Sequence, residues 1–382
     1  MLRADKSKQT IQYVTLNSLQ EGVGASQVLE YVLSLTRFFH IRLISIEVKK
    51  PSEELVAHLS KADIEWVYVN GSRRSFRQKV LNLIRVYRSV NPSLVTHARS
   101  DLAFVISSFR GVRKAVWDSR SLNAEQTIFI KGKDAKSFEY LILRFFERYC
   151  AKKSSFVVCI TNSAREFLID RHGINPNQIQ VVSTCTNLKK FKSTLMPDLL
   201  GGIHVLFAGT LSSAYDIDLM NRIVAELRRR YKVTFTMALS VGHTEFYKLM
   251  DPDRIVFLSH NEMPHQISEA HFGLSILKHD IGLSLLSVSS TKIAEFLASG
   301  RPVIVNANQG DIGEIVMRTG AGVATEITQD HDVVEYVDRL EQIIKSNAIS
   351  TLCRNVASQH YDLADGIKNL SKIYYDLLNQ SD

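Results

Sequence analysis

The sequence predicts an α/β protein made of two doubly wound, Rossmann-like domains. A chain of 382 residues has the length of two domains rather than one. Short runs rich in β-branched residues alternate with longer segments of helical periodicity, as in parallel sheets that carry helices on both faces. The alternation stops at residues 196–202 and then starts again, which indicates a second domain of the same kind.

Each predicted strand is a short apolar run between turn residues, and helical stretches fill most of the gaps. The first domain contains the runs Ile11–Leu16, Ile41–Val48, Trp66–Val69, Leu94–His97, Lys114–Trp117, Phe156–Thr161 and Ile179–Val182. The second domain contains the runs His204–Phe207, Lys232–Leu239, Arg254–Leu258, Phe272–Leu277, Pro302–Asn306 and Ala321–Ala324.

Pro197 and the pair Gly201-Gly202 break both periodicities, so we place the domain boundary beside them. Residues 1–196 are expected to form the first domain, 197–360 the second and 361–382 a closing helix. Ligands of open α/β sheets bind outside the carboxyl ends of the strands, so a ligand is expected in a central cleft that both domains face. Apolar residues at helical spacing predict the closing helix: Ile367, Leu370, Ile373, Tyr374 and Leu377.

The composition is that of an ordinary folded protein, with 45% apolar and 23% charged residues. No apolar run approaches the ~20 residues of a membrane helix, and the polar start Met1–Thr10 does not resemble a signal peptide. Neither export nor membrane spanning is therefore expected. The four cysteines are far apart without a CxxC pair, so we expect them to be reduced and mostly buried.

Charge is distributed unequally along the chain. Residues 1–200 hold 31 Lys plus Arg against 17 Asp plus Glu, whereas residues 201–382 hold 16 against 22. A basic half suits nucleic acid, an anionic membrane surface or a phosphorylated substrate, and composition alone does not choose among them.

The first strand is followed by a glycine loop, Glu21–Gln27, which opens a helix. Glycines permit close backbone approach, and a helix N-terminus favours an anion. The loop fits the dinucleotide fingerprint GxGxxG poorly, because Gln27 occupies the third glycine position. Nicotinamide binding, a structural turn, and a phosphate or sugar contact through Gly22 and Gly24 all remain open.

Ser289–Val305 reads as a helix, a turn and a strand, with hydroxyl residues at the N-cap, Gly300 at the end of the helix and Pro302 before the strand. At 100° per residue, Ile293, Phe296 and Leu297 point to the core. Lys292 and Glu295 share the opposite face. Lys292 and free amides could hold a nucleoside diphosphate while Glu295 accepts from ribose hydroxyls, but an exposed ion pair explains the spacing equally well.

Several segments resemble, in order, the motifs of glycosyltransferase family 4, and together they span nearly the whole chain. Ser290–Val305 resembles "PTK..EYLA.G.PVI" and Phe207-Ala208-Gly209-Thr210-Leu211 resembles "F.G.L". The other similar segments are the glycine loop Gly22–Val28, Leu94–Ser100 ("DVIHARS"), Glu147 ("ER"), Val157–Leu168 with Gln180–Phe191, and Gly310-Asp311 with Glu314 ("GD..E").

The resemblance implies the two-domain GT-B fold and transfer of a sugar from a nucleotide donor with retention of configuration. It implies that no metal or other cofactor is needed. Lys292, Glu295 and Asp118 are the implied catalytic residues, and Asp118 is expected beside the transferred sugar. Acceptor or sugar contacts are expected from His97, Arg99 and Arg120. Donor contacts are expected from Gly22, Gly24, Gly209, Thr210, Gly282, Leu283, Ser290 and Thr291.

The sequence also departs from the family. Where the family often has a first glutamate, eight residues before Glu295, this chain has Ser287. Thr210 and Ala214-Tyr215 stand where many members have an Arg and a Lys for the donor diphosphate, and Ser183-Thr184 replace Pro and Asn. The diphosphate charge would then fall to Lys292, to backbone amides, or to Arg99 and Arg120.

Two of these residues also have simpler explanations. An aspartate that closes a strand, as Asp118 does, is commonly a helix N-cap or a turn former. His97 could be a core histidine whose hydrogen bonds are satisfied by its neighbours.

Arg73–Val90 predicts a basic amphipathic helix with one apolar stripe: Phe76, Val80, Leu83, Ile84 and Tyr87. Arg74, Arg77, Arg85 and Arg88 lie beside this stripe, together with Leu81. At about 1 kcal/mol for each basic residue near an anionic leaflet, four arginines supply about 4 kcal/mol, enough for reversible docking. The alternative is the solvated face of an ordinary packing helix.

We therefore expect a glycosyltransferase of cell-surface polysaccharide or glycolipid synthesis, cytoplasmic and docked peripherally on the inner face of the cell membrane. Its expected partners are a nucleotide-sugar donor, a glycan or lipid-linked acceptor and an anionic membrane surface, with no nucleic acid. A sugar-nucleotide 2-epimerase of the same fold and a non-catalytic binding or scaffold subunit remain alternatives. The sequence does not name the sugar, nucleobase, acceptor or linkage.

Overall fold

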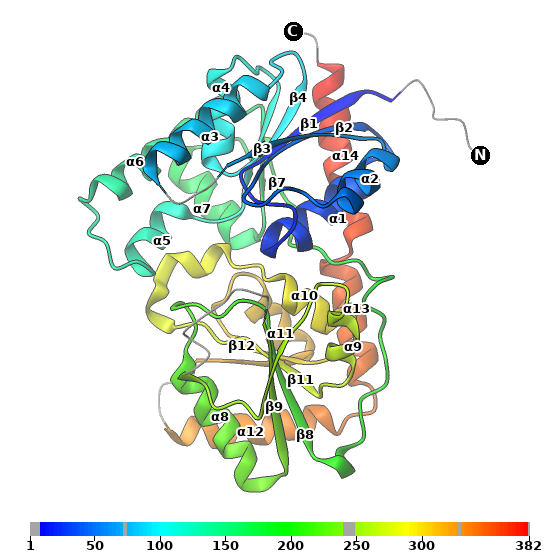
Figure 1. Ribbon diagram of the computed structural model, residues 1–382. Coiled ribbons are helices and arrows are strands. Elements are labelled where there is room, and N and C mark those ends of the chain that lie inside the picture. Colours follow the sequence, from blue (N-terminus) through cyan, green and yellow to red (C-terminus); the bar gives the residue numbers. More distant parts are fainter. Residues whose placement is uncertain (1–7, 72–74, 240–248, 327–329, 381–382) are drawn as a thin grey trace. The chain divides into compact units, whose positions relative to one another are not determined.

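The structure is a computed structural model that describes residues 8–71, 75–239, 249–326 and 330–380 (Figure 1). Contacts divide the chain into two compact units, and each contains one parallel sheet. Unit 1 comprises Met1–Ala124, Asp134–Val182 and Ala364–Asp382. Unit 2 comprises Glu125–Lys133 and Ser183–Leu363.

Unit 1 is built on a parallel sheet with the strand order β3-β2-β1-β4-β5-β6-β7. The strands are β1 (Thr10–Thr15), β2 (His40–Glu47), β3 (Ile64–Asn70), β4 (Val95–Arg99), β5 (Ala115–Ser119), β6 (Phe156–Cys159) and β7 (Ile179–Val181). The helices are α1 (Leu29–Leu35), α2 (Glu53–Lys61), α3 (Phe76–Ser89), α4 (Asp101–Phe109), α6 (Phe138–Lys153), α7 (Asn162–His172) and α14 (Leu363–Asn379), and α5 (Asn123–Phe129) leads into unit 2.

Unit 2 has a second parallel sheet, with the strand order β10-β9-β8-β11-β12-β13. The strands are β8 (Ile203–Ala208), β9 (Val233–Leu239), β10 (Arg254–Phe257), β11 (Phe272–Leu274), β12 (Val303–Asn306) and β13 (Gly322–Thr325). The helices are α8 (Ile217–Arg230), α9 (Met263–Ser268), α10 (Thr291–Ala298), α11 (Ile312–Thr319), α12 (Asp330–Ile344) and α13 (Ile349–His360). Every strand predicted from the sequence is confirmed in both sheets.

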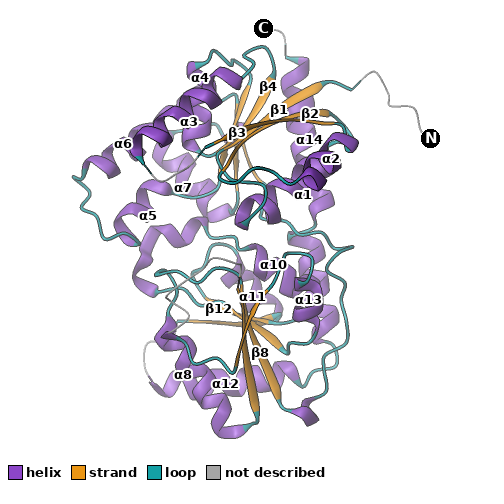
Figure 2. Cartoon of the chain, in the orientation of Figure 1, coloured by secondary structure: helices purple, strands orange, loops and turns teal. Residues whose placement is uncertain are grey.

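Apart from its edge strand β10, the sheet of unit 2 is buried on both faces, which explains why these strands read as continuous apolar runs. Successive residues of β8 point to opposite faces. Val205 and Phe207 enter a core with α8 and α12, whereas Leu206 and Ala208 enter a second core with α9, α10, α11 and α13. Figure 2 shows helices flanking both sheets.

The chain leaves unit 1 at Val182, upstream of the boundary expected at residue 196. The reason is that residues 183–202 pack onto unit 2. Phe191 is fully buried in its core, and Arg354 donates to the carbonyl oxygen of Phe191 at 2.6 Å. Arg301, also buried, donates to the carbonyl oxygen of Thr194 at 3.0 Å. Pro197 and the glycine pair therefore mark a local break within unit 2.

The closing helix α14 belongs to unit 1, and all five residues predicted for its apolar stripe are buried. The ring of Tyr374 packs edge-on against Phe39, with centroids 5.6 Å apart. The four cysteines are buried thiols, as expected. No single helix in the described part of the chain has both the length and the apolar character of a membrane span, although the bent pair His279–Ser287 and Thr291–Ala298 passes that test by length and composition.

His271, buried just before β11, is expected to make unit 2 sensitive to acid, and the half-buried His204 of β8 lies beside it. His271 Nδ1 accepts from the backbone N–H of His204 at 2.9 Å, so this nitrogen must stay unprotonated. Burial, with a contribution from the neighbouring His204, lowers the pKa of His271 to about 4. The unfolded chain therefore binds more protons than the folded one between pH ~6.5 and ~4, and stability falls as the pH falls through that range.

We expect His271→Asn to keep the acceptor, through Oδ1, and to remove the titration. Between pH 7 and pH 4.5 the free energy of unfolding of the variant should fall less than that of the wild type, by at least about 1 kcal/mol. Urea unfolding followed by circular dichroism measures the difference. Tryptophan fluorescence is the control, because Trp66 and Trp117 both lie in unit 1. Equal pH dependence in the two proteins would show that His271 does not carry the effect.

Candidate functional site

Ligands of doubly wound sheets bind outside the carboxyl ends of the strands, at the topological switch point where the strand order reverses. We call this part of each sheet its ligand edge. In unit 1 this point lies between β1 and β4, and in unit 2 between β8 and β11. The predicted donor, acceptor and catalytic residues of unit 1 lie in the loop after β1, or within or just after β4 and β5, whereas Arg77, Arg85 and Arg88 lie on α3. The corresponding residues of unit 2 follow β8 and β11. The topology thus brings the predicted donor, acceptor and catalytic residues of each unit toward its ligand edge.

In the glycine loop after β1, packing of the chain requires a glycine at position 24 but not at position 22. A Cβ on Gly24 would lie 1.7 Å from the carbonyl oxygen of Ser18, so only glycine fits there. Gly22 has a φ of +54° and open space around its Cα. Gly24 is required for chain packing at the π-helical turn Gly24–Val28, and Gly22 is left with room for a ligand.

Asp118 and His97 form a fully buried pair in unit 1, with no exposed surface. Asp118 Oδ2 lies 2.9 Å from His97 Nε2, and His97 Nδ1 lies 2.8 Å from the hydroxyl of Tyr374 on α14. Burial lowers the pKa of His97, so the ring is neutral, Nε2–H donates to Asp118 and Nδ1 accepts from Tyr374. His97 also stacks on Tyr13 at 4.4 Å. His97 thus has the satisfied hydrogen bonds of a core histidine.

Two arginines cover the Asp118 carboxylate. Arg120 Nε donates to Oδ2 at 2.8 Å, and Arg99 Nη1 lies 3.6 Å from the same oxygen. Burial alone would raise the pKa of Asp118, but Arg120, His97 and Arg99 together hold it well below its ordinary value. One anion faces two cations here, so the group carries an excess of one positive charge at the ligand edge.

The same two arginines are held from the other side by the helix that follows the glycine loop. Arg99 Nη2 donates to the side-chain oxygen of Gln27. The Arg120 guanidinium lies over the Tyr31 ring at 5.5 Å. Ser100, directly after Arg99, has a φ of +111°, a strained conformation for a residue with a side chain. The strained backbone of Ser100 and the buried charges of Arg99 and Asp118 therefore lie together at the ligand edge of unit 1.

In unit 2, the ammonium of Lys292 contacts two aromatic rings beside the end of β8. Its Nζ is 4.1 Å from the centroid of the Phe207 ring and 4.5 Å from that of Tyr215, and it donates to the Tyr215 hydroxyl at 2.7 Å. Gly209 has a φ of +97°, and a Cβ on it would lie 4.0 Å from this ammonium. Phe207 and Gly209 belong to the "F.G.L" segment, so that segment and Lys292 form one site.

The helix that carries Lys292 begins without a side-chain cap, as α1, α9, α11 and α13 also do. Ser290 occupies the N-cap position of α10, but its side chain makes no cap hydrogen bond. Elsewhere in the described structure Ser52, Ser75, Ser100, Ser137, Thr161 and Asp216 do cap their helices. Ser290, Thr291 and Lys292 are half-buried. The start of α10 is therefore neither buried under protein nor capped by Ser290.

Glu295 lies one turn further along α10 and is almost fully buried. Its Oε1 is 2.9 Å from His260 Nε2, and His260 Nδ1 is 2.8 Å from Lys190 Nζ. Lys292 and Glu295 therefore bond different partners, which argues against the simple exposed ion pair. Ile293, Phe296 and Leu297 are buried in the core, as the helical spacing predicted.

Of the remaining predicted donor residues, Thr210 lies after β8, and Gly282 and Leu283 lie in the 3-10 helical segment His279–Ser287. Thr210 follows Gly209 and is exposed. Gly282 has a φ of +51°, and a Cβ there would lie 2.5 Å from the Phe129 ring, so this glycine is needed for packing. Leu283, beside it, is exposed. Ser287, which stands in the place of a family glutamate, is buried and bonds the Ser284 carbonyl oxygen at 3.4 Å.

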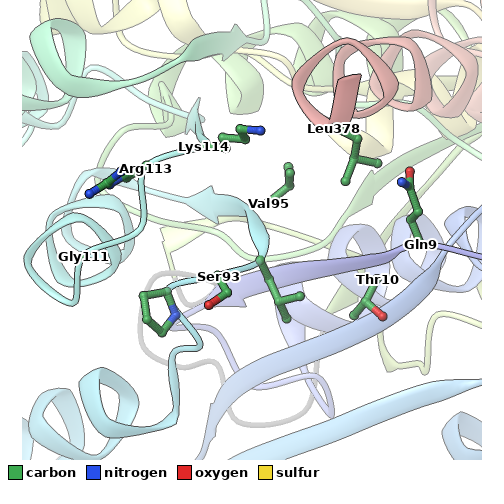
Figure 3. A pocket seen from close by; sticks show the side chains of 10 residues that line it. Gln9, Thr10, Ser93, Val95, Gly111, Arg113, Lys114 and Leu378 are labelled. Carbon is green, nitrogen blue, oxygen red and sulfur yellow. The ribbon is translucent and has the colours of Figure 1, made fainter. Parts of the chain in front are cut away.

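A cavity of about 590 Å³ in unit 1 lies at the opposite edge of the sheet (Figure 3). It is lined by the amino ends of β1 and β4, by Arg113 and Lys114 before β5, and by Leu378 of α14. None of the predicted site residues lines it. Within residues that the structure describes, no group of three or more His, Cys, Asp or Glu side chains could hold a metal ion.

Sequence reasoning missed the residues that hold the predicted ones in place: Gln27, Tyr31, Lys190, Tyr215, His260 and Tyr374. From the sequence, Tyr215 stands out only because many family members have an arginine or a lysine in that neighbourhood, and its contact with Lys292 is not predicted. Tyr374 is 277 positions from His97 along the chain, and no spacing rule connects such a pair. Arg74 lies outside the described residues, and Arg77, Arg85 and Arg88 are exposed on α3.

Comparison with known proteins finds likeness at the level of structure. No family model and no curated protein matches the sequence. A glycosyltransferase from Rickettsia africae is 15% identical, with a TM-score of 0.69 over 98% of this chain and 100% of the other. Sucrose-phosphate synthase from Thermosynechococcus elongatus is 12% identical, with a TM-score of 0.75 over 98% and 100%. HepE from Anabaena, solved with UDP-glucose, is 14% identical, with a TM-score of 0.69 over 96% and 99%.

These neighbours are glycosyltransferases of the GT-B fold, and the likeness covers both units of this chain. The two parallel sheets, with their seven and six strands, match that fold. The chain therefore has the GT-B fold, as the sequence motifs led us to expect.

Proposed function

We propose that the chain is a retaining glycosyltransferase of the family 4 type, which moves a sugar from a nucleotide-sugar to a glycan or lipid-linked acceptor. The neighbours of the same fold support a transferase, and the HepE complex with UDP-glucose favours a nucleotide-sugar donor. A role in cell-surface polysaccharide synthesis, at the cytoplasmic face of a membrane, is part of the proposal.

The observation that carries the proposal is the position of Lys292 at the ligand edge of unit 2. The ammonium of Lys292 lies there beside the turn at Gly209. The same helix, α10, begins at Ser290 without a side-chain cap. Backbone amides at a helix N-terminus and a lysine are a common combination for phosphate groups. We assign this edge to the donor diphosphate, and Glu295 to the ribose hydroxyls.

In this proposal the acceptor hydroxyl attacks the anomeric carbon from the side that the nucleotide leaves. The bond from that carbon to the diphosphate oxygen breaks, a bond to the acceptor oxygen forms, and the acceptor proton passes to the departing phosphate. The protein supplies no nucleophile. Lys292 and the amides of α10, rather than a metal ion, stabilise the charge that develops on the diphosphate.

Unit 1 is assigned to the acceptor side of the reaction. Asp118 and His97 are buried, so in this conformation they position Arg99 and Arg120 rather than present their own polar atoms. The excess positive charge of this group suits a sugar or acceptor that carries a phosphate.

Binding of nucleotides is the first test. Thermal unfolding is measured with UDP, the other nucleoside diphosphates, and then their sugars. A ligand at 100 times its Kd stabilises the folded state by about 2.7 kcal/mol, which is easily detected. Release of nucleotide and loss of donor, with and without candidate acceptors, then measure turnover. No stabilisation by any nucleoside diphosphate would contradict the assignment.

Glu295→Gln is expected to weaken nucleotide binding by roughly tenfold, since a charged acceptor bonds ribose hydroxyls more strongly than a neutral amide does. Titration calorimetry with the best nucleoside diphosphate measures the change. Glu269→Gln, an exposed carboxylate on the same unit, is the matched control. Unchanged affinity in the Glu295 variant would remove this residue from the donor site.

A further inference from the structure

A group of exposed apolar side chains lies on neighbouring helices of unit 1. The members come from α3, the end of α4, and α6, and we call them the α3–α6 face: Phe76, Val80, Leu81, Ile84, Tyr87, Phe109, Phe138, Leu141 and Phe145. Phe76 is 81% exposed and Phe138 is 80% exposed. Figure 1 shows α3, α4 and α6 side by side, and α4 packs against both of the others. Exposed apolar groups of this extent mark an interaction site in a folded protein.

The α3–α6 face is continuous across the three helices. The guanidinium of Arg110, just after α4, lies over the Tyr87 ring of α3 at 5.5 Å. Phe109 packs against Tyr149 of α6 with ring centroids 5.5 Å apart, and Tyr149 lies 6.4 Å from Phe145. Ring contacts thus lead from α3 through the end of α4 to α6.

The apolar stripe of α3 does not cover the core of unit 1. The buried residues of this helix are Asn82 and Val86, and Leu83 is only half-buried. The other four residues of the predicted stripe are exposed. The helix packs against β2 and β3, yet most of its apolar stripe stays on the exposed side.

Positive charge surrounds these apolar residues. Together α3 and α6 contain eight Lys or Arg and two Glu. One of the two, Glu147, is buried and bonded to Arg144 and His172, so it does not offset the exposed cations. Arg77 and Arg88 of α3 and Arg148 of α6 are exposed.

We propose that the α3–α6 face docks on an anionic lipid bilayer, with the phenylalanines in the interfacial region and the arginines and lysines at the lipid headgroups. Charge complementarity favours a bilayer over a protein partner. Lysine and other charged residues are depleted in the cores of protein interfaces, whereas aromatic and basic residues together are typical of peripheral membrane helices. The proposal assigns a docking surface to the membrane location proposed above, and it does not depend on the transfer reaction.

Vesicle flotation with the full chain, without donor or acceptor, tests the docking. The probes are phosphatidylcholine vesicles and vesicles with about 30% phosphatidylglycerol. We expect binding to the anionic vesicles only, weakened by raising the salt from ~0.1 M to ~0.5 M. Arg77→Glu with Arg88→Glu should reduce the partition coefficient at least roughly thirtyfold, because two basic contacts are lost. Lys49→Glu with Lys50→Glu, an equal charge change at exposed positions outside this face, is the matched control.

A second measurement follows the apolar contact itself. Phe138→Trp should show a blue-shifted emission when anionic vesicles are added, after subtraction of the wild-type signal. Phe257→Trp, at an exposed position on unit 2, should show no shift. Phe138→Ser with Phe145→Ser should lose vesicle binding while retaining the wild-type melting temperature.

Equal binding to neutral vesicles, or equal loss in the Lys49 and Lys50 control, would overturn the proposal. So would absence of vesicle binding together with a concentration-dependent dimer that Phe145→Ser abolishes, because the face would then be an interface between two copies of the chain. None of these outcomes bears on nucleotide binding, so docking and the proposed reaction can fail separately.

Discussion

Replacing Lys292 by Met is expected to reduce turnover at saturating donor by roughly a hundredfold to a thousandfold, the usual cost of removing one preorganised charge-stabilising group. The ammonium lies between the rings of Phe207 and Tyr215 and donates to the Tyr215 hydroxyl at 2.7 Å. Methionine fills the space of the side-chain stem and removes the charge. The negative charge that develops on the departing diphosphate would then no longer be stabilised by the ammonium on α10.

Turnover is measured as nucleotide released per enzyme under donor saturation, so that weaker binding does not enter the rate. Lys232→Met removes the same charge from an exposed position of unit 2 before β9, at the opposite edge of the sheet, and should retain wild-type turnover. Tyr215→Phe keeps the ammonium and removes only its hydrogen-bond partner, so a smaller loss, about tenfold or less, is expected. A Lys292→Met enzyme with an unaltered turnover number would contradict the proposed role.

Most of the fold could be predicted from the sequence, because parallel strands covered on both faces leave a strong pattern. His204–Phe207 is such a run: its residues enter two different cores, so nearly every position must be apolar. The closing helix was equally clear, since its five apolar residues share one buried face. The boundary was less accessible to prediction, because the packing of residues 183–202 onto unit 2 depends on tertiary partners such as Arg354 and Arg301.

The site could be predicted only in outline. The sequence indicated which residues reach the ligand edges, because strand ends and helix starts are local features. It could not show that Glu295 meets His260, or that Tyr374 meets His97, because these pairs form only when distant segments fold together. Periodicity likewise revealed the apolar stripe of α3 without showing that the stripe stays exposed.

Glycines were the least certain part of the prediction. A glycine beside a strand end suits a ligand, a tight turn or a close packing contact equally well. In the structure Gly24 is fixed by the Ser18 carbonyl and Gly282 by the Phe129 ring. Gly22 and Gly209 have positive φ values without such close contacts, so they are the better candidates for approach to a ligand.

Asp118→Asn is expected to destabilise unit 1 by about 3–5 kcal/mol, the usual cost of removing one partner from a buried charged group. The carboxylate is fully buried, and its Oδ2 accepts from Arg120 and from His97. An asparagine has nearly the same shape and no charge, so Arg99 and Arg120 would face each other without an anion. Urea unfolding followed by tryptophan fluorescence measures this change in unit 1, where both tryptophans lie.

Two further variants separate the charge effect from simple loss of a hydrogen bond. Asp170→Asn, at an exposed position of the same unit, should stay within about 0.5 kcal/mol of the wild type. Adding Arg120→Met to Asp118→Asn removes the uncompensated cation, so the double variant should be more stable than the sum of the two single changes predicts. Strict additivity would mean that Asp118 and Arg120 do not stabilise each other, and the buried group would then be a poor anchor for Arg99 and Arg120 at the ligand edge.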